Sequence, residues 1–198
     1  MGSDVAGWRW IPNVVDPELG LLPVCTRTTD PYTFLTIGDL IPIKDQTTLL
    51  RGLATGGPGL ADCRLRIAGD GAQEGMLRAL AAELGVSARV EFLGRISRER
   101  VAQELDLCHC FVLTSQMETF GVVLIEALSR GRPVIATKCG GPQDVIDESN
   151  GLLVPVGGIQ ELAEAMVWMR GNSNRFDPAE LRADVVKRFG EEALVRNL

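Results

Sequence analysis

The stretch Ser115-Gln116-Met117-Glu118-Thr119-Phe120-Gly121-Val122-Val123-Leu124-Ile125-Glu126-Ala127-Leu128 follows a short apolar run at residues 111–113. A run of Phe, Val and Leu predicts a buried strand, and the apolar residues of 121–128 predict a helix. Two carboxylates, Glu118 and Glu126, lie before and after the start of this helix. The stretch therefore indicates a strand, a loop and a helix, the unit from which parallel sheets are built.

The same alternation of short apolar runs and amphipathic stretches continues along the chain in both directions. It predicts a doubly wound α/β fold with a parallel sheet. Predicted strands cover residues 34–37, 64–68, 90–93, 111–113, 133–136 and 151–154. Predicted helices cover residues 47–53, 74–84, a segment capped by Ser97, 121–128, 159–169 and 178–189.

Length and composition fit one globular domain. The chain has 198 residues, of which 45% are hydrophobic, enough to bury a full core. Residues 1–29 have scattered Pro, Asp and Gly and weak periodicity, so we expect a linker or surface strap there and the domain at 30–198. Trp8 and Trp10 could stack on a ligand, but surface packing at a terminus is the favoured interpretation.

Charge and hydropathy exclude several classes of function. A net charge of -6 argues against a protein that coats nucleic acid, because neutralising phosphates needs clustered Lys and Arg. The chain has neither a long apolar run nor a signal sequence, which predicts a cytoplasmic protein.

The cysteines and the single histidine point to no cofactor. Five cysteines form an odd set without framework spacing, so we expect free thiols. Cys108-His109-Cys110 invites a metal interpretation, but no second ligand pair stands at a fitting distance, and we expect no metal site. His109 is accordingly a weak candidate for acid/base work.

The start of the helix at 121–128 suits a phosphate. Its first backbone N–H groups have no partner within the helix, and Gly121 lets a ligand approach them closely. Thr119 or a neighbour is expected to cap the helix.

Glu126 poses an electrostatic problem, because the predicted helix is apolar on nearly every face and is expected to be buried against the sheet. An unpaired buried carboxylate costs several kcal/mol, so a partner is required. Two partners remain open, the hydroxyls of a ribose or an Arg or Lys of the protein.

Two loops at the predicted carboxyl edge of the sheet complete the candidate site. Glu118 is either a ligand-binding acid or an exposed loop acid that complements the helix dipole. The loop 138–144 contains Gly140 and Gly141, which either permit close approach of a backbone or form an ordinary flexible turn.

Taken in order, these motifs resemble the retaining nucleotide-sugar glycosyltransferases of family 4, also called group 1. The strongest match is a Glu-x7-Glu motif at Glu118 and Glu126. Supporting stretches are Ile11-Pro12-Asn13-Val14-Val15-Asp16, Ile37-Gly38 to Lys44, Ala68-Gly69-Asp70-Gly71, Val90-Glu91-Phe92-Leu93-Gly94, Gly131-Arg132-Pro133-Val134-Ile135-Ala136-Thr137 and Gly140-Gly141. The family has the two-domain GT-B fold, so the resemblance implies its C-terminal, Rossmann-like, donor-binding half.

The resemblance also implies roles for individual residues. Glu118 would orient the donor sugar and Lys44 would neutralise the leaving diphosphate, which makes them the candidate catalytic residues, while Glu126 would bind the ribose. The remaining implied donor-site residues are Gly121, Val122 and Val123 at the diphosphate and sugar, Gly38 and Gly69 in the glycine loops, and Val90, Phe92 and Leu93 at the base.

The implied reaction is sugar transfer with retention at the anomeric carbon, by attack from the face that the diphosphate leaves. The donor would be a nucleotide-diphosphate sugar, with UDP or GDP the expected nucleotide. Because the chain has no Asp-x-Asp motif, we expect no metal cofactor, and Lys44 and helix N–H groups would stabilise the leaving group. A glycan or lipid-linked acceptor would bind an N-terminal domain, and peripheral membrane association of the full-length enzyme is compatible with this acceptor.

The chain departs from the family at two places. Asp39 stands where the family usually has an arginine that binds the diphosphate, and a carboxylate about 4 Å from a phosphate would cost about 4 kcal/mol unless it points away or pairs with Lys44. The acceptor-binding domain is also missing, which suggests a fragment. Two alternatives stay open: a non-catalytic nucleotide-sugar-binding or regulatory module, and a sugar-nucleotide epimerase relative.

Overall fold

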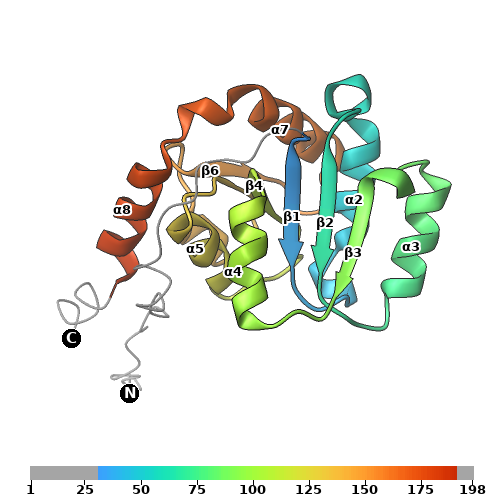
Figure 1. The fold of residues 1–198 in the computed structure, drawn as a ribbon, viewed down its shortest axis with the longest axis horizontal. Helices are drawn as coiled ribbons and strands as arrows, with labels where there is room; N and C mark the ends of the chain where they lie inside the picture. The colour runs from blue at the N-terminus through green and yellow to red at the C-terminus, as the bar shows by residue number, and fades with distance from the viewer. Residues whose placement is uncertain (1–30, 191–198) are drawn as a thin grey trace, which may run out of the picture.

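A computed structural model describes residues 31–190 (Figure 1). The predicted linker or strap at 1–29, with Trp8 and Trp10, lies outside the described residues. So do Cys25 and the motif at 11–16.

Within residues 31–190, six parallel strands form one sheet in the order β3-β2-β1-β4-β5-β6. This order confirms the predicted doubly wound, Rossmann-like sheet. The chain starts in the middle, builds outward through β2 and β3, returns beside β1 as β4, and builds outward the other way. The strands are β1 Thr33–Ile37, β2 Arg64–Ala68, β3 Val90–Gly94, β4 Cys110–Leu113, β5 Val134–Thr137 and β6 Gly151–Val154.

Helices cover both faces of the sheet (Figure 1). Within these layers α2 packs on α7, and α5 packs on α8. The α-helices are α2 Gln46–Thr55, α3 Glu74–Glu83, α4 Arg98–Leu107, α5 Val122–Ser129, α6 Pro142–Val145, α7 Ile159–Asn172 and α8 Pro178–Phe189. Short 3-10 helices are η1 Pro42–Lys44, η2 Gly57–Leu60, η3 Ser87–Arg89 and η4 Ser173–Arg175.

Local sequence signals explain most of these boundaries. Ser97 caps α4 by accepting a hydrogen bond from the Arg100 N–H at 3.3 Å. Gly85 ends the turn after α3 in the left-handed region, at φ 68°. Every residue of β4 and β5 is buried, as expected for inner strands of a sheet covered on both faces.

Most of α5 is buried against the sheet and α8, as expected, but one side of the helix is partly exposed. Leu124, Ile125, Ala127, Leu128 and Ser129 are buried, but Val122 is 40% exposed, and Val123 and Glu126 are partly exposed. Positions 122, 123 and 126 share one side of a helix. The sheet and α8 cover the other sides of α5, so a strongly apolar sequence leaves one strip reaching solvent.

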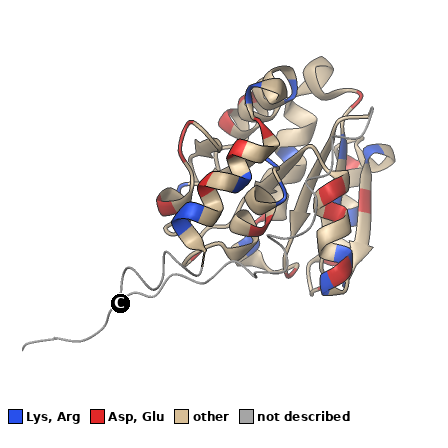
Figure 2. Ribbon diagram, turned by 60° about the vertical axis from the view of Figure 1, so that its left-hand side comes forward, with Lys and Arg blue, Asp and Glu red and all other residues tan. Residues whose placement is uncertain are grey.

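The surface carries charges of both signs. Figure 2 shows Lys and Arg interspersed with Asp and Glu along the helices. Within residues 31–190, no helix is both long and apolar enough to cross a membrane.

Candidate functional site

The candidate site lies at the carboxyl ends of β1 and β4. These strands are neighbours in the sheet, but the connections that follow them run to opposite sides. In such a sheet the loops separate at this switch point and leave a crevice for a ligand. The loop after β1 contains Gly38, Asp39 and η1, and the loop after β4 contains Glu118 and Gly121.

Lys44 and Glu118 meet at this edge of the sheet. The Lys44 Nζ donates a hydrogen bond to Glu118 Oε2 at 2.6 Å, and the two side chains are 28% and 17% exposed. The residues lie 74 positions apart in sequence. The two candidate catalytic residues are therefore brought together as a partly buried ion pair.

The backbone around Lys44 is fixed by the loop after β4. The Thr114 hydroxyl donates to the Lys44 carbonyl at 3.1 Å, and the Gln116 N–H donates to the Ile43 carbonyl at 2.8 Å. After Lys44, Asp45 takes the left-handed conformation at φ 46° and caps α2 through the Thr48 N–H. The sequence interpretation missed Asp45, although Asp before a helix is an N-cap signal.

Two glycines flank the ion pair. A Cβ atom added to Gly38 would lie 4.0 Å from Lys44 Cδ, and one added to Gly121 would lie 3.6 Å from Glu118 Cγ. Gly121 also has φ 80°, a conformation that side chains disfavour. A Cβ atom at either position would therefore come into van der Waals contact with the ion-paired side chains.

Gly121 itself is the N-cap of α5, and no side chain caps this helix. The expectation that Thr119 or a neighbour caps it is wrong, because the chain enters the helix through a left-handed glycine. The first N–H groups of α5 have no acceptor within the helix, so this end can receive an anion. Glu126 lies one turn after Val122 on the partly exposed side of the same helix.

The loop with Gly140 and Gly141 packs directly on the loop of Glu118. The Glu118 N–H donates to the Cys139 carbonyl at 3.1 Å, and the Gly141 N–H donates to the Glu118 carbonyl at 2.8 Å. A Cβ atom on Gly141 would lie 2.4 Å from the Cα of Phe120. Gly140 and Gly141 therefore let the backbones of two loops pack closely, and the interpretation of this loop as an ordinary flexible turn is wrong.

A third loop, after β2, adjoins the loop after β1. A Cβ atom on Gly69 would lie 1.9 Å from the Gly38 carbonyl oxygen, so no larger residue fits at Gly69. Gly71 approaches Leu40 in the same way, with a Cβ position 2.5 Å from the Leu40 carbonyl oxygen. The Gly69 N–H continues the contact to β3 by donating to the Gly94 carbonyl at 2.8 Å.

The candidate base-binding residues lie farther from the ion pair. Val90, Phe92 and Leu93 are on β3, the outer strand, which lies about 10 Å from β1 at the usual strand spacing. All three are partly exposed, and the Arg78 guanidinium stands 4.4 Å from the centre of the Phe92 ring. The structure does not bring them into contact with Lys44 and Glu118.

Asp39 is exposed at the end of β1, and its carbonyl accepts a hydrogen bond from Gln46 Nε2 at 3.1 Å. Gln46 is 2% exposed and was not singled out from the sequence. The partner found for Lys44 is Glu118, so the considered pairing of Asp39 with Lys44 is not the arrangement of this site.

His109 lies at the opposite edge of the sheet. It is buried, its Nδ1 accepts a hydrogen bond from the Thr33 N–H at 3.0 Å, and its ring stacks on Tyr32 with ring centres 4.6 Å apart. Thr33 begins β1, whereas the site lies where β1 ends. His109 is therefore a packing residue. Among residues 31–190, no group of three or more His, Cys, Asp and Glu side chains is arranged to hold a metal ion.

The family model that matches this chain describes glycosyltransferases, and so do the names of two relatives found by comparison with known proteins. The sequence model described as "Glycosyl transferases group 1" matches residues 25–188. The chain is 37% identical over 136 residues to D-inositol 3-phosphate glycosyltransferase of Mycobacteroides abscessus, a match that covers 66% of this chain and 30% of that protein. It is 32% identical over 168 residues to the lipopolysaccharide core biosynthesis glycosyltransferase LpsE of Rhizobium meliloti, covering 83% and 48%.

Solved structures with the same fold include glycosyltransferases. The lipopolysaccharide outer core galactosyltransferase WaaB superposes with a TM-score of 0.83 and 27% identity, covering 96% of this chain and 53% of that chain. Anabaena Alr3699/HepE in complex with UDP superposes with a TM-score of 0.74 and 27% identity, covering 84% and 46%.

The chain thus spans about half or less of the length of these relatives. Its fold corresponds to the C-terminal half of a GT-B enzyme. Since the family match extends over most of the sequence and the solved relatives share the parallel sheet, the chain belongs to the group 1 glycosyltransferases.

Proposed function

We propose that this chain is the donor-binding half of a retaining glycosyltransferase that uses a nucleotide-diphosphate sugar. The observation that carries the proposal is the Lys44–Glu118 pair at the switch point of the sheet, beside the uncapped start of α5. The cation and the helix N–H groups suit the diphosphate of such a donor, and the carboxylate suits the hydroxyls of its sugar.

The diphosphate is the anion that Lys44 and α5 would hold. Lys44 would exchange its hydrogen bond to Glu118 for one to a phosphate oxygen, while the N–H groups at Val122 and Val123 would face the same group. When the bond between the anomeric carbon and the diphosphate breaks, negative charge grows on the leaving oxygen. Donors aimed at that oxygen stabilise the transition state more than the ground state.

Glu118, released from Lys44, would accept hydrogen bonds from hydroxyls of the donor sugar. Carboxylates bind hydroxyl donors through charge-assisted hydrogen bonds, which fix the sugar's orientation. The acceptor oxygen would then attack from the face that the diphosphate leaves, with retention at the anomeric carbon.

Glu126 is the proposed ribose ligand. It lies on the partly exposed side of α5 that also carries Val122, so a nucleotide whose diphosphate meets the start of α5 could place its ribose along this side. A uracil or guanine base would then extend toward β3. HepE is described in complexes with UDP and UDP-glucose, which supports UDP, whereas one relative is named a GDP-mannose-dependent mannosyltransferase, which supports GDP.

We propose that transfer needs the other half found in relatives, where a glycan or lipid-linked acceptor would bind. One observation favours a second candidate, a nucleotide-sugar-binding module without turnover. Asp39 adds an exposed carboxylate to the loop that would face the diphosphate, which opposes donor binding.

The test is calorimetric titration of the chain with UDP, GDP and ADP, followed by Lys44→Ala. We expect one nucleotide to bind, and Lys44→Ala to weaken it about ten- to a hundredfold, the usual range for loss of a hydrogen bond to a charged group. The affinity for uridine or guanosine, which lack the phosphates, should be the same in Lys44→Ala and the native chain. Lys187→Ala removes an exposed lysine from α8 and is the matched control. Absence of binding to all three nucleotides would overturn the proposal.

Glu126→Gln separates the ribose contact from the diphosphate contact. It should weaken the nucleotide and its nucleoside by the same factor, because both carry the ribose. Equal affinities of the variant and the native chain for the nucleoside would remove Glu126 from this role.

A further inference from the structure

The last turn of α8 contacts the loop that carries Glu118. Phe189, the final residue of α8, meets Phe120 edge to face, with ring centres 5.9 Å apart and an interplanar angle of 79°. Both rings are buried, at 6% and 5% exposure. Phe120 lies between Glu118 and Gly121, so its ring anchors the segment that joins the carboxylate to the start of α5.

The backbone of Phe120 is also enclosed by the neighbouring loop. Its Cα lies 2.4 Å from where a Cβ atom of Gly141 would be, and the Gly141 N–H donates to the Glu118 carbonyl. Phe120 is thus held on its backbone side by Gly141 and on its ring side by Phe189. Interiors packed this closely transmit small displacements.

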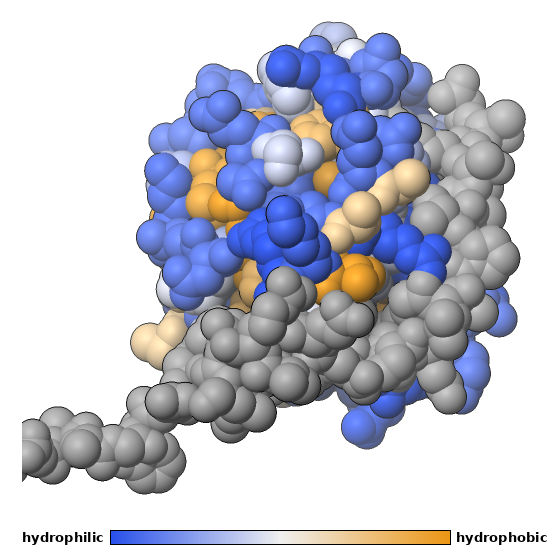
Figure 3. All heavy atoms as spheres, turned by 90° about the vertical axis from the view of Figure 1, so that its left-hand side faces the viewer, coloured by the Kyte–Doolittle hydropathy of each residue, from blue (hydrophilic) through white to orange (hydrophobic). Residues whose placement is uncertain are grey.

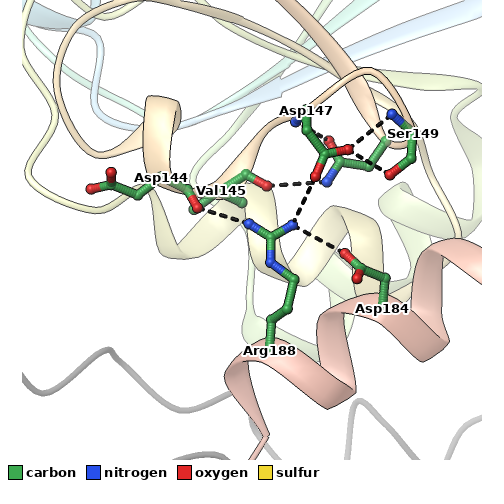
Figure 4. Close-up of polar contacts among 7 residues, drawn as sticks. Asp144, Val145, Asp147, Ser149, Asp184 and Arg188 are labelled. Carbon is green, nitrogen blue, oxygen red and sulfur yellow. Dashed lines mark hydrogen bonds and ion pairs between the residues drawn. The ribbon is translucent and has the colours of Figure 1, made fainter.

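Arg188, next to Phe189, fixes α8 to the segment after the Gly141 loop (Figure 4). Its Nη2 donates to the Asp144 carbonyl at 2.8 Å, and its Nη1 lies 3.3 Å from Asp147 Oδ2 and 3.1 Å from Asp184 Oδ2. Its guanidinium also stands 4.9 Å from the centre of the Phe189 ring.

Figure 3, which views the side of the molecule where α8 lies, shows mostly hydrophilic residues around smaller apolar patches.

We propose that Phe189 is a positioning residue for the donor site and that it acts through Phe120 on the loop from Glu118 to Gly121. The inference rests on the proposed function for its effect on nucleotide affinity. The contact itself is a property of the fold. Loss of the ring would leave space behind Phe120, and the loop could then move Glu118 away from Lys44 and turn the first N–H groups of α5 out of line.

The experiment compares Phe189→Ala with Val185→Ala in the full chain. Val185 is fully buried one turn earlier on the same helix, so its truncation also creates a cavity under α8 but leaves the Phe120 ring in contact with Phe189. Phe189→Leu keeps an apolar side chain there and remains testable should Phe189→Ala fail to fold. Amide hydrogen exchange is measured for the segment 116–124, with β2 as a reference, together with calorimetric affinity for the nucleotide that the native chain binds.

We expect Phe189→Ala to speed exchange in 116–124 and to weaken nucleotide binding about tenfold, with Phe189→Leu intermediate. Val185→Ala should leave both quantities near their native values. Exchange in 116–124 that is the same in Phe189→Ala and Val185→Ala overturns the inference, whatever the affinities. Absence of nucleotide binding by the native chain overturns the proposed function instead, and the exchange data still decide the role of Phe189.

Discussion

Asp39 decides how much negative charge the loop after β1 presents to a diphosphate. It is exposed at the end of β1, and Lys44 in the same loop pairs with Glu118. A bound diphosphate would therefore meet the Lys44 ammonium in a loop that also presents the Asp39 carboxylate, with the Glu118 carboxylate on the facing loop. Each carboxylate opposes the anion, and the more exposed one does so through water, which screens it.

Asp39→Arg should strengthen UDP or GDP binding by about five- to tenfold, because it removes a negative charge and adds a positive one beside the diphosphate. Asp39→Asn should give a smaller gain. Titrations at two salt concentrations check the cause, since an electrostatic gain shrinks as salt rises. A gain of the same size for the nucleoside would point to a change in the loop rather than in charge.

At the residue scale, the sequence indicated candidate side chains but not how they meet. Lys44 and Glu118 were singled out through the family resemblance, and their roles remain predictions. Their ion pair joins residues 74 positions apart, and it depends on the neighbouring positions of β1 and β4, which no local pattern encodes. Gln46 was missed because its side chain binds a backbone carbonyl of a loop, whereas Asp45 carried a local N-cap signal that was overlooked.

At the scale of elements, apolar runs predicted the inner strands β4 and β5 well, because both strands bury every residue. The strands at 64–68 and 151–154 and the helix at 178–189 have the predicted bounds. The partly exposed strip of α5 had no signal in the sequence. An apolar helix has no polar face to mark the side that reaches solvent, and only the neighbouring elements determine that side.

Gly121→Ala tests the start of α5. The left-handed conformation costs an alanine about 1–2 kcal/mol, and its Cβ would lie 2.8 Å from Leu124 Cδ1, so the helix start must shift. We expect lower thermal stability and weaker nucleotide binding. Gly75→Ala is the control, because Gly75 lies in α3 and no atom lies within 4 Å of the added Cβ. This substitution should stabilise the chain by about 0.5–1 kcal/mol. Unchanged stability in Gly121→Ala would mean that the left-handed cap is not required.

At the scale of the whole molecule, the doubly wound class followed from alternating strand and helix patterns, whereas the strand order did not. That order creates the switch point, from which the connections after β1 and β4 run in opposite directions. The pairing of α8 with α5 is equally a property of the complete fold. For this reason the link from Phe189 to Phe120 has no signal in either segment of sequence.

The buried thiols make the free energy of unfolding depend on pH in the alkaline range. Burial raises the pKa of Cys63 to about 11 and that of Cys108 to about 12. In the unfolded chain thiols ionise near pH 8.5. Above that pH the unfolded chain releases protons that the folded chain retains, so the free energy of unfolding falls as pH rises through this window. Below it, both states hold the protons and the thiols give no pH dependence.

Denaturant unfolding between about pH 7 and pH 10.5 should therefore show a declining free energy, with the decline beginning near pH 8.5. The variant with both Cys63→Ala and Cys108→Ala should decline less steeply. It would also be less stable at every pH, because removing buried sulfur leaves small cavities, but that cost is constant and does not alter the slope. The slope thus isolates the thiols from other packing effects. If the free energy of unfolding falls with pH equally steeply in the variant and the native chain, groups other than Cys63 and Cys108 cause the loss of stability at alkaline pH.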